Sequence, residues 1–255
     1  MPTLSFLGGN PSIVAINIAI AAIMLAYTSY LDVKTREVPD KVWLVFGGIG
    51  AVLQAYEILS GTTAPISLAV SLGLGTAVGM GLYFFGFYGG ADGKALVVLS
   101  LLVPRFSPAV GLYSISPLMI LTNGVLVSIL LPVALLIYNG WRIARHERIF
   151  EGFTEPAYRK LLATFLGYKQ TGKPREFQFG MEKTVELAPA NSGTPVQTKK
   201  FDFSLMRDDF ETKSGTWVTP GIPLLVFFTF GFFALLLYGD LVIGLIRFIA
   251  HFFVG

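Results

Sequence analysis

The sequence predicts an all-α polytopic membrane protein with six transmembrane helices, the fourth of them short, and a small α+β cytosolic insertion before the last helix. Hydrophobic residues make up 53% of the 255 residues and charged residues only 14%. Several apolar runs reach the roughly 20 residues that a helix needs to cross a bilayer, and they carry almost no charge. A polar stretch, 142–219, separates the last apolar run from the others. The lipid bilayer is therefore an expected partner.

The first three apolar runs, 12–31, 42–59 and 64–87, are each long enough to cross a membrane. No Lys or Arg precedes the first run, so it lacks the basic segment with which a signal peptide begins. We therefore expect a retained helix whose N-terminus lies outside the cell.

The third run is rich in glycine. Small residues at four-residue spacing let helix backbones approach closely, which favours a packed helix at the centre of the bundle. Glycine is also simply common in membrane helices, so a single one of these residues decides little. The glycines concerned are Gly73, Gly75, Gly79 and Gly81.

The fourth run, 95–103, ends at Pro104 and is too short to cross about 30 Å of hydrocarbon by itself. It either crosses with the help of residues up to Leu112 or re-enters the face it came from. The fifth run, 117–141, is long enough to cross and is expected to kink at Pro132.

The distribution of Lys and Arg decides between these alternatives. With the N-terminus outside, re-entry would translocate the basic cluster that begins at Arg142, whereas crossing leaves only Arg105 and Arg247 outside. The sequence therefore predicts six crossings. The cations that then lie at cytoplasmic helix ends are Lys34, Arg36, Lys41, Lys94, Arg142, Arg145 and Arg148.

The insertion is predicted to hold one amphipathic helix and a β-hairpin. Thr154 as N-cap and Gly167 at the exit bound a stretch with apolar residues at helical spacing. Residues 177–181 and 201–205 alternate between apolar and mostly polar or small side chains, as two half-buried strands do. The insertion either covers the cytoplasmic helix ends or grips a substrate.

Three segments follow from these elements. Residues 1–141 hold the first five helices and the candidate catalytic acids, 142–219 form the cytosolic insertion, and 220–255 hold the last helix and an apolar tail.

Asp32 and Asp92 are the candidate catalytic residues. Two complete spans lie between them, so both acids lie at the same membrane face whatever the orientation. Two carboxyl groups that share a site cannot both ionise cheaply, so one holds a proton while the other accepts one from water. Such a pair hydrolyses a peptide bond without a metal or a cofactor.

The composition argues against other classes of site. The chain has no cysteine and two histidines, which predicts no metal site. The balance of 19 Lys and Arg against 16 Asp and Glu is slight, so nucleic acid is not an expected partner.

The helix ends favour one division of labour within the pair. Asp92 precedes the fourth helix, whose N-terminal end favours a carboxylate, whereas Asp32 follows the C-terminus of the first. On this hypothesis Asp92 is the base and Asp32 the protonated partner.

Glu37 and Asp40 are expected to be solvated loop acids. The residues expected to bind substrate or to position the loop are Gly89, Gly90, Ala91, Gly93 and Lys94. Without Asp32, the same glycines would indicate only a loop that caps a helix. Cytoplasmic anchoring of the helix explains Lys94 without any role in the site.

The stretch Gly89-Gly90-Ala91-Asp92 resembles the GxGD signature of membrane-embedded aspartic peptidases. Asp32 and the residues that follow it resemble the first catalytic motif of the type IV prepilin peptidases. The segment 217–223, which leads into the last helix, is similar to that of the archaeal preflagellin (prearchaellin) peptidase branch. Ala91 departs from the glycine usual in bacterial members and fits the looser archaeal pattern. The cysteine-rich domain of bacterial relatives has no counterpart here, which puts methyltransferase activity in doubt.

The resemblance implies an enzyme with Asp32 and Asp92 as its catalytic pair. Its substrates would be prepilin and preflagellin precursors, from which it would remove short, basic class III signal peptides at the cytoplasmic face of the cell membrane.

Two other functions fit parts of the sequence. A non-enzymatic transporter or ion-binding protein would use the two aspartates to bind a cation or relay protons, but both acids lie at helix ends rather than at the bilayer midplane. A peptidase of the presenilin or signal-peptide-peptidase type shares the GxGD signature. Its second aspartate is expected inside a helix, whereas Asp32 is predicted to lie in a loop.

Overall fold

The computed structural model describes residues 10–86, 89–105, 115–172, 177–187, 196–203 and 214–254. They form two compact units. The first contains the described residues up to Val127 and from Pro223 onward, and the second runs from Ser128 to Ile222. The three segments predicted from the sequence stay a prediction.

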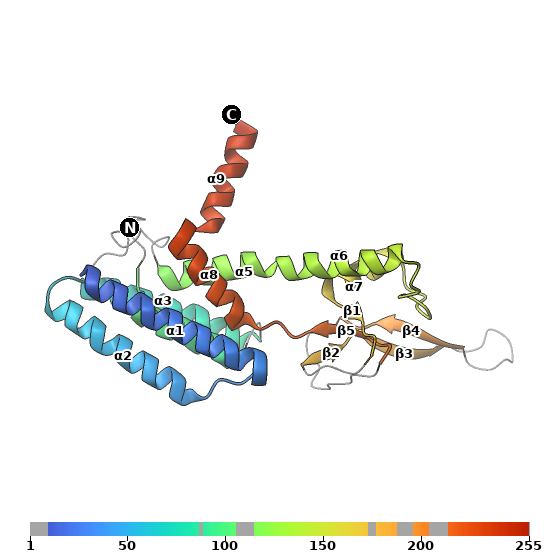
Figure 1. Ribbon diagram of the computed structural model, residues 1–255, viewed down its shortest axis with the longest axis horizontal. Helices are drawn as coiled ribbons and strands as arrows, with labels where there is room; N and C mark the ends of the chain where they lie inside the picture. Colours follow the sequence, from blue (N-terminus) through green and yellow to red (C-terminus); the bar gives the residue numbers. More distant parts are fainter. Residues whose placement is uncertain are drawn as a thin grey trace. The chain divides into compact units, whose positions relative to one another are not determined.

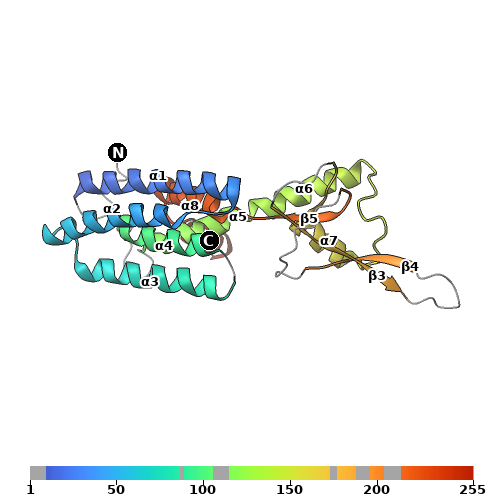
Figure 2. The ribbon, with the colours of Figure 1, turned by 90° about the horizontal axis from the view of Figure 1, so that it is seen from below.

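The first unit is a bundle of helices (Figures 1 and 2). Pro11 opens the first helix, and the side chain of Asn10 caps it by accepting a hydrogen bond from the N–H of Ser12 (3.0 Å). Pro65 opens the third helix in the same position. The helices are α1 (Pro11–Thr35), α2 (Asp40–Leu59), α3 (Pro65–Phe84), α4 (Gly90–Leu102), α5 (Ser116–Ser128), α8 (Leu224–Tyr238) and α9 (Leu241–Val254).

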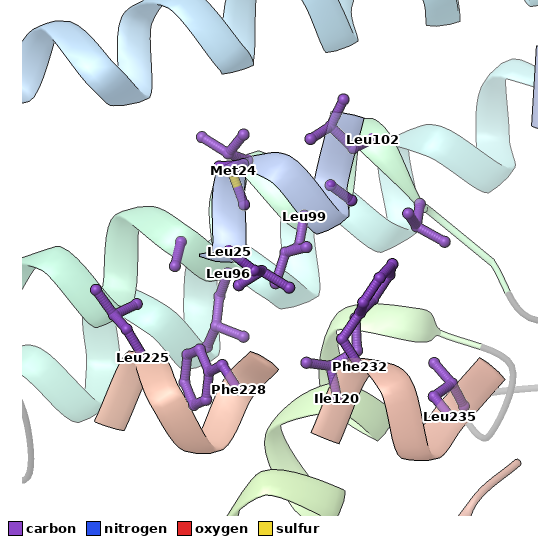
Figure 3. Close-up of a cluster of buried hydrophobic side chains, with 14 of the residues drawn as sticks. Met24, Leu25, Leu96, Leu99, Leu102, Ile120, Leu225, Phe228, Phe232 and Leu235 are labelled. Atoms are coloured by element: carbon purple, nitrogen blue, oxygen red, sulfur yellow. The ribbon is translucent and has the colours of Figure 1, made fainter. Parts of the chain in front are cut away.

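The short helix α4 is the centre of this bundle. It contacts α1, α2, α3 and α8, and in Figure 2 it lies between α2 and α3. The prediction that the glycine-rich third run is the central helix is therefore wrong, because α3 packs chiefly on α4. Fully buried side chains of α1, α4, α5 and α8 form the core (Figure 3), among them Leu25, Leu96, Ile120 and Phe228.

Four helical stretches among the described residues are long and apolar enough to cross a membrane. They are α1, α2, α3 and the stretch Ser116–Ala144; α8 and α9, bent by 59° at their junction, make a fifth if they form one span. With 13 residues, α4 is about 20 Å long. It does not pass this test, so the structure gives four or five spans where the sequence predicts six.

In its described residues, the second unit combines two helices with five strands. α6 (Leu130–Ala144) begins two residues before Pro132, which has no N–H to give to the carbonyl of Ser128. The kink expected at Pro132 stays a prediction. β1 (Tyr168–Lys169) and β2 (Gln178–Gly180) pair antiparallel on either side of β5 (Trp217–Pro220). β3 (Glu182–Leu187) pairs antiparallel with β4 (Val196–Phe201).

The amphipathic helix of the insertion is α7 (Ala157–Leu166). Gly167 follows it as predicted, but the predicted N-cap Thr154 is wrong. The N-cap is Pro156, whose φ of −65° already suits a helix start, so the helix begins after it without a side-chain cap.

The predicted hairpin differs in register from the strands observed. Phe177 has a φ of +59° and lies outside any strand, and β2 pairs with β5 rather than with the 201–205 segment. β4 ends at Phe201, opposite Glu182 of β3. Leu205 lies outside the described residues.

Candidate active site

Asp32 lies inside the last turn of α1, which continues to Thr35. The helix ends where Arg36 adopts a left-handed conformation (φ +57°) and donates its N–H to the carbonyl of Asp32 (3.2 Å). The prediction that Asp32 follows the helix in a loop is therefore wrong. The apolar run ends at Leu31, but the residues that follow it, Asp, Val, Lys and Thr, can all adopt helical conformation, so the helix extends to Thr35.

The carboxylate of Asp32 has partners on two helices. Its Oδ2 accepts a hydrogen bond from the backbone N–H of Leu225 in the first turn of α8 (3.3 Å). Its Oδ1 lies 3.9 Å from Nη1 of Arg36, one turn further along α1. The side chain of Asp32 is 15% exposed.

Asp92 lies in the first turn of α4, three residues after the N-cap Gly89, and not before the helix as predicted. Its Oδ2 accepts a hydrogen bond from the N–H of Gly89 (3.1 Å), which satisfies one of the free backbone donors of that turn. Asp92 is 8% exposed. The glycine-rich stretch is thus a helix start with a buried acid.

The two acids lie within electrostatic reach of each other. α1 packs against α4, and the charges of Asp32 and Arg36 both act on the carboxyl group of Asp92. The fold thus brings both predicted acids to neighbouring helices; that they act as one catalytic pair stays a prediction. Within the described ranges, no group of three or more His, Asp or Glu side chains is arranged to hold a metal ion.

Lys94 points away from this pair. Its Nζ lies 2.5 Å from Oδ1 of Asp40, which is solvent-exposed as predicted but is the first residue of α2 rather than a loop residue. Lys94 also lines a largely apolar groove of about 700 Å³ with Val98 and Leu101 of α4 and residues of α2 and α3. Residues two apart on a helix face nearly opposite directions, so this groove lies on the side of α4 away from Asp92.

The glycines near Asp92 have packing roles of their own. Gly93 faces Gly79 of α3 so closely that a Cβ on either would lie 2.9 Å from the carbonyl oxygen of the other. A Cβ on Gly90 would meet the ring of Tyr83 at 3.4 Å. Whether Gly89, Gly90, Ala91 and Gly93 also contact a substrate stays a prediction.

Residues 19–137, which include both acids, match the family model of the type IV leader peptidase family. The chain is 28% identical over 247 residues to the preflagellin peptidase of Methanocaldococcus jannaschii, covering 90% of this chain and 97% of that protein. It is 26% identical over 240 residues to the preflagellin peptidase of Methanococcus voltae, covering 89% and 97%. A third preflagellin peptidase, from Methanococcus maripaludis, is 25% identical over 243 residues, covering 87% and 94%.

The segment 19–137, which holds both acids, matches the type IV leader peptidase family, and this match and the three relatives support an aspartic protease. A presenilin-type peptidase was disfavoured because its second aspartate lies inside a helix and Asp32 was predicted to lie in a loop. Asp32 does lie inside a helix, so that reason no longer holds. The match to the type IV leader peptidase family decides against this alternative instead.

Several neighbours of the candidate pair were missed from the sequence. Leu225 acts through its backbone, so its residue type gives no signal. Ser29 and Thr229, which bond to each other beside Asp32, do leave one: Ser29 lies three residues before Asp32 on the same helix face, and Thr229 interrupts an apolar run.

Proposed function

We propose that this protein is a membrane-embedded endopeptidase that removes leader peptides from prepilin and preflagellin precursors, and that Asp32 and Asp92 together activate the attacking water. The observation that carries the proposal is the electrostatic pairing of two acids from α1 and α4 in a segment that matches the type IV leader peptidase family. All three relatives are named for preflagellin, and each aligns with most of this chain.

In this proposal Asp32 is the ionised base and Asp92 the protonated acid, the reverse of the division inferred from the helix ends. The N–H of Leu225 and the guanidinium of Arg36 favour a negative charge on Asp32. Asp92 also accepts a backbone hydrogen bond, but it is more deeply buried and, within the described residues, has no ion pair like that of Asp32 with Arg36. A proton shared by the pair is therefore assigned to Asp92.

The reaction needs only water as co-reactant. Asp32 takes a proton from water as the water oxygen bonds to the scissile carbonyl carbon, while Asp92 gives its proton to the carbonyl oxygen. The tetrahedral intermediate then loses its C–N bond as the leaving nitrogen takes the proton from Asp32. Asp92 recovers a proton from the intermediate's hydroxyl group as the new carboxyl group forms, which returns both acids to their starting state.

The proposal also puts the site at the cytoplasmic face of the cell membrane, with the N-terminus outside and six crossings. Positive side chains near the site, among them Lys34, Arg36 and Lys94, support this orientation. The shortness of α4 requires that the bilayer thins around it or that neighbouring helices cover its C-terminal end. The second unit would then lie largely in the cytosol.

A cleavage assay tests the proposed function. Membranes that contain the protein are mixed with a tagged precursor that has a basic leader followed by an apolar helix. We expect the unchanged protein to cleave it, and Asp32→Asn and Asp92→Asn each to lower the rate at least about 10²-fold at equal protein levels. Asp40→Asn is the matched control, because Asp40 is exposed and pairs with Lys94 on the far side of α4. Cleavage that survives either catalytic substitution would remove the pair from the mechanism.

A further inference from the structure

A polar stripe on α1 faces the start of α8. Ser29 and Asp32 lie three residues apart on one face of α1, with Leu25 one turn before them and Arg36 one turn after. The opposing helix α8 is apolar from Leu224 to Leu237 except for Thr229. Ser29 is 9% exposed, so the stripe is buried where the two helices meet.

Two hydroxyl groups connect the helices along this stripe. Oγ of Ser29 lies 2.7 Å from Oγ1 of Thr229 and 2.9 Å from the carbonyl oxygen of Leu225. Oγ1 of Thr229 in turn lies 3.2 Å from the carbonyl oxygen of Leu25 and 3.0 Å from that of Leu225. The network therefore fixes Leu225 from its carbonyl side, across the boundary between α1 and α8.

The N–H of the same residue is the one that Asp32 binds. The first backbone donors of a helix have no partner within it. Pro223, the N-cap of α8, has no N–H, and the N–H of Val226 goes back to the carbonyl of Pro223 (3.1 Å). The N–H of Leu225 is free to leave the helix, and it donates to Oδ2 of Asp32.

We infer that Ser29 and Thr229 are positioning residues for the reaction: they hold the first turn of α8 against α1 so that the N–H of Leu225 and the positive end of α8 face the carboxylate of Asp32. The inference rests on the proposed function. In this inference, the first turn of α8 keeps Asp32 ionised and oriented. The two hydroxyl groups act only through α8, because they bond to each other and to the carbonyl of Leu225.

Few other charges bear on Asp32. On its own helix Arg36 faces it, and on α4 the carboxyl group of Asp92 does. α8 carries no charged side chain between Leu224 and Tyr238. At the start of α2, Asp40 is paired with Lys94. After the guanidinium of Arg36, the backbone donor that α8 presents is what stabilises the ionised form of Asp32.

The test compares two substitutions of one residue. Thr229→Val keeps the shape of the side chain and removes the hydroxyl, whereas Thr229→Ser keeps the hydroxyl and removes a methyl group. We expect Thr229→Val and Ser29→Ala to lower kcat several-fold with little change in KM, and Thr229→Ser to behave like the unchanged protein. Ser100→Ala is a matched control, because the Ser100 hydroxyl donates to the carbonyl of Leu96 in its own helix (2.7 Å) and faces α3.

The pH dependence of kcat separates positioning from packing. Losing the donor destabilises ionised Asp32, so the acidic limb of the profile moves to higher pH, by about half a unit or more, in Thr229→Val and Ser29→Ala. The inference is overturned if the acidic limb of the pH profile is unshifted in both variants, or if Thr229→Ser shifts it equally. In either case, cleavage by the unchanged protein still supports the proposed function. If the unchanged protein cleaves no precursor, the proposed function itself fails.

Discussion

Gly79 of α3 and Gly93 of α4 face each other so closely that a Cβ atom on either would lie 2.9 Å from the carbonyl oxygen of the other. Gly93 is the residue after Asp92, so this contact sets how near α4 lies to α3 beside that acid. The nearest atoms on both sides belong to the backbone, so they cannot move aside as the end of a flexible side chain can.

We expect Gly79→Ala to push α3 away from α4 and to destabilise the protein by about 1–3 kcal/mol, as overpacking of a buried contact does. Cleavage should fall with it, because Asp92 moves with α4. Gly81→Ala is the matched control: a Cβ there meets no atom within 4 Å, and the loss of glycine's freedom in the unfolded chain makes it neutral or slightly stabilising. Thermal unfolding in detergent measures both, and equal midpoints would contradict the role of the contact.

The glycines of α3 also show what the sequence could predict. Four glycines indicated a closely packed helix, but only Gly75 and Gly79, one turn apart, face α4; a Cβ on Gly75 would collide with Oγ of Ser100. Gly73 and Gly81 have open space around them. Composition predicts that a close contact exists, whereas helical periodicity and the partner helix decide which residues make it.

The candidate site divides in the same way. Local motifs and the parity of the spans were enough to single out Asp32 and Asp92. The partner of Asp32 on α8 was not predictable, because Leu225 is 193 residues away and contributes a backbone N–H. β5 was missed for a related reason: Trp217–Pro220 becomes a strand only through its pairing with β1 and β2.

Lys94→Gln should have little effect, although Lys94 is two residues from Asp92. Its ion pair with Asp40 is exposed, 43% on the lysine and 75% on the aspartate, and exposed pairs contribute under about 1 kcal/mol. We expect an unfolding midpoint close to that of the unchanged protein and a cleavage rate within about two-fold, as expected for a surface pair. A rate reduced more than ten-fold would mean that substrate reaches the groove side of α4.

Cysteine labelling tests whether α4 crosses the membrane. The chain has no cysteine of its own, so single substitutions can be labelled with a membrane-impermeant maleimide without background. Glu37→Cys lies between α1 and α2, and Arg105→Cys lies just after α4; both positions are exposed. If α4 crosses, intact cells label Arg105→Cys while Glu37→Cys needs permeabilised cells. Equal labelling of both from one side would mean that α4 re-enters.

The far end of α8 is held by Asn123 of α5, which is fully buried. Its Nδ2 donates to the carbonyl of Gly239 (3.0 Å), and its Oδ1 accepts from the N–H of Leu241 (2.9 Å). One side chain thus satisfies two of the backbone groups that the break between α8 and α9 leaves unpaired. Asp240 caps α9 by accepting from the N–H groups of Val242 and Ile243.

Asn123→Leu keeps the size of the side chain and leaves these two backbone groups without a partner, so we expect it to destabilise the protein by about 1–3 kcal/mol. Thr122→Val is the neighbouring control, because its hydroxyl bonds only within α5 to the carbonyl of Met119 (3.1 Å). Leu225 and Gly239 lie at opposite ends of α8, about 20 Å apart along the helix. Asn123→Leu should therefore lower the unfolding midpoint and leave the pH profile of cleavage unshifted, whereas Thr229→Val shifts the profile. A shifted profile in Asn123→Leu would mean that α8 transmits strain along its whole length to Asp32.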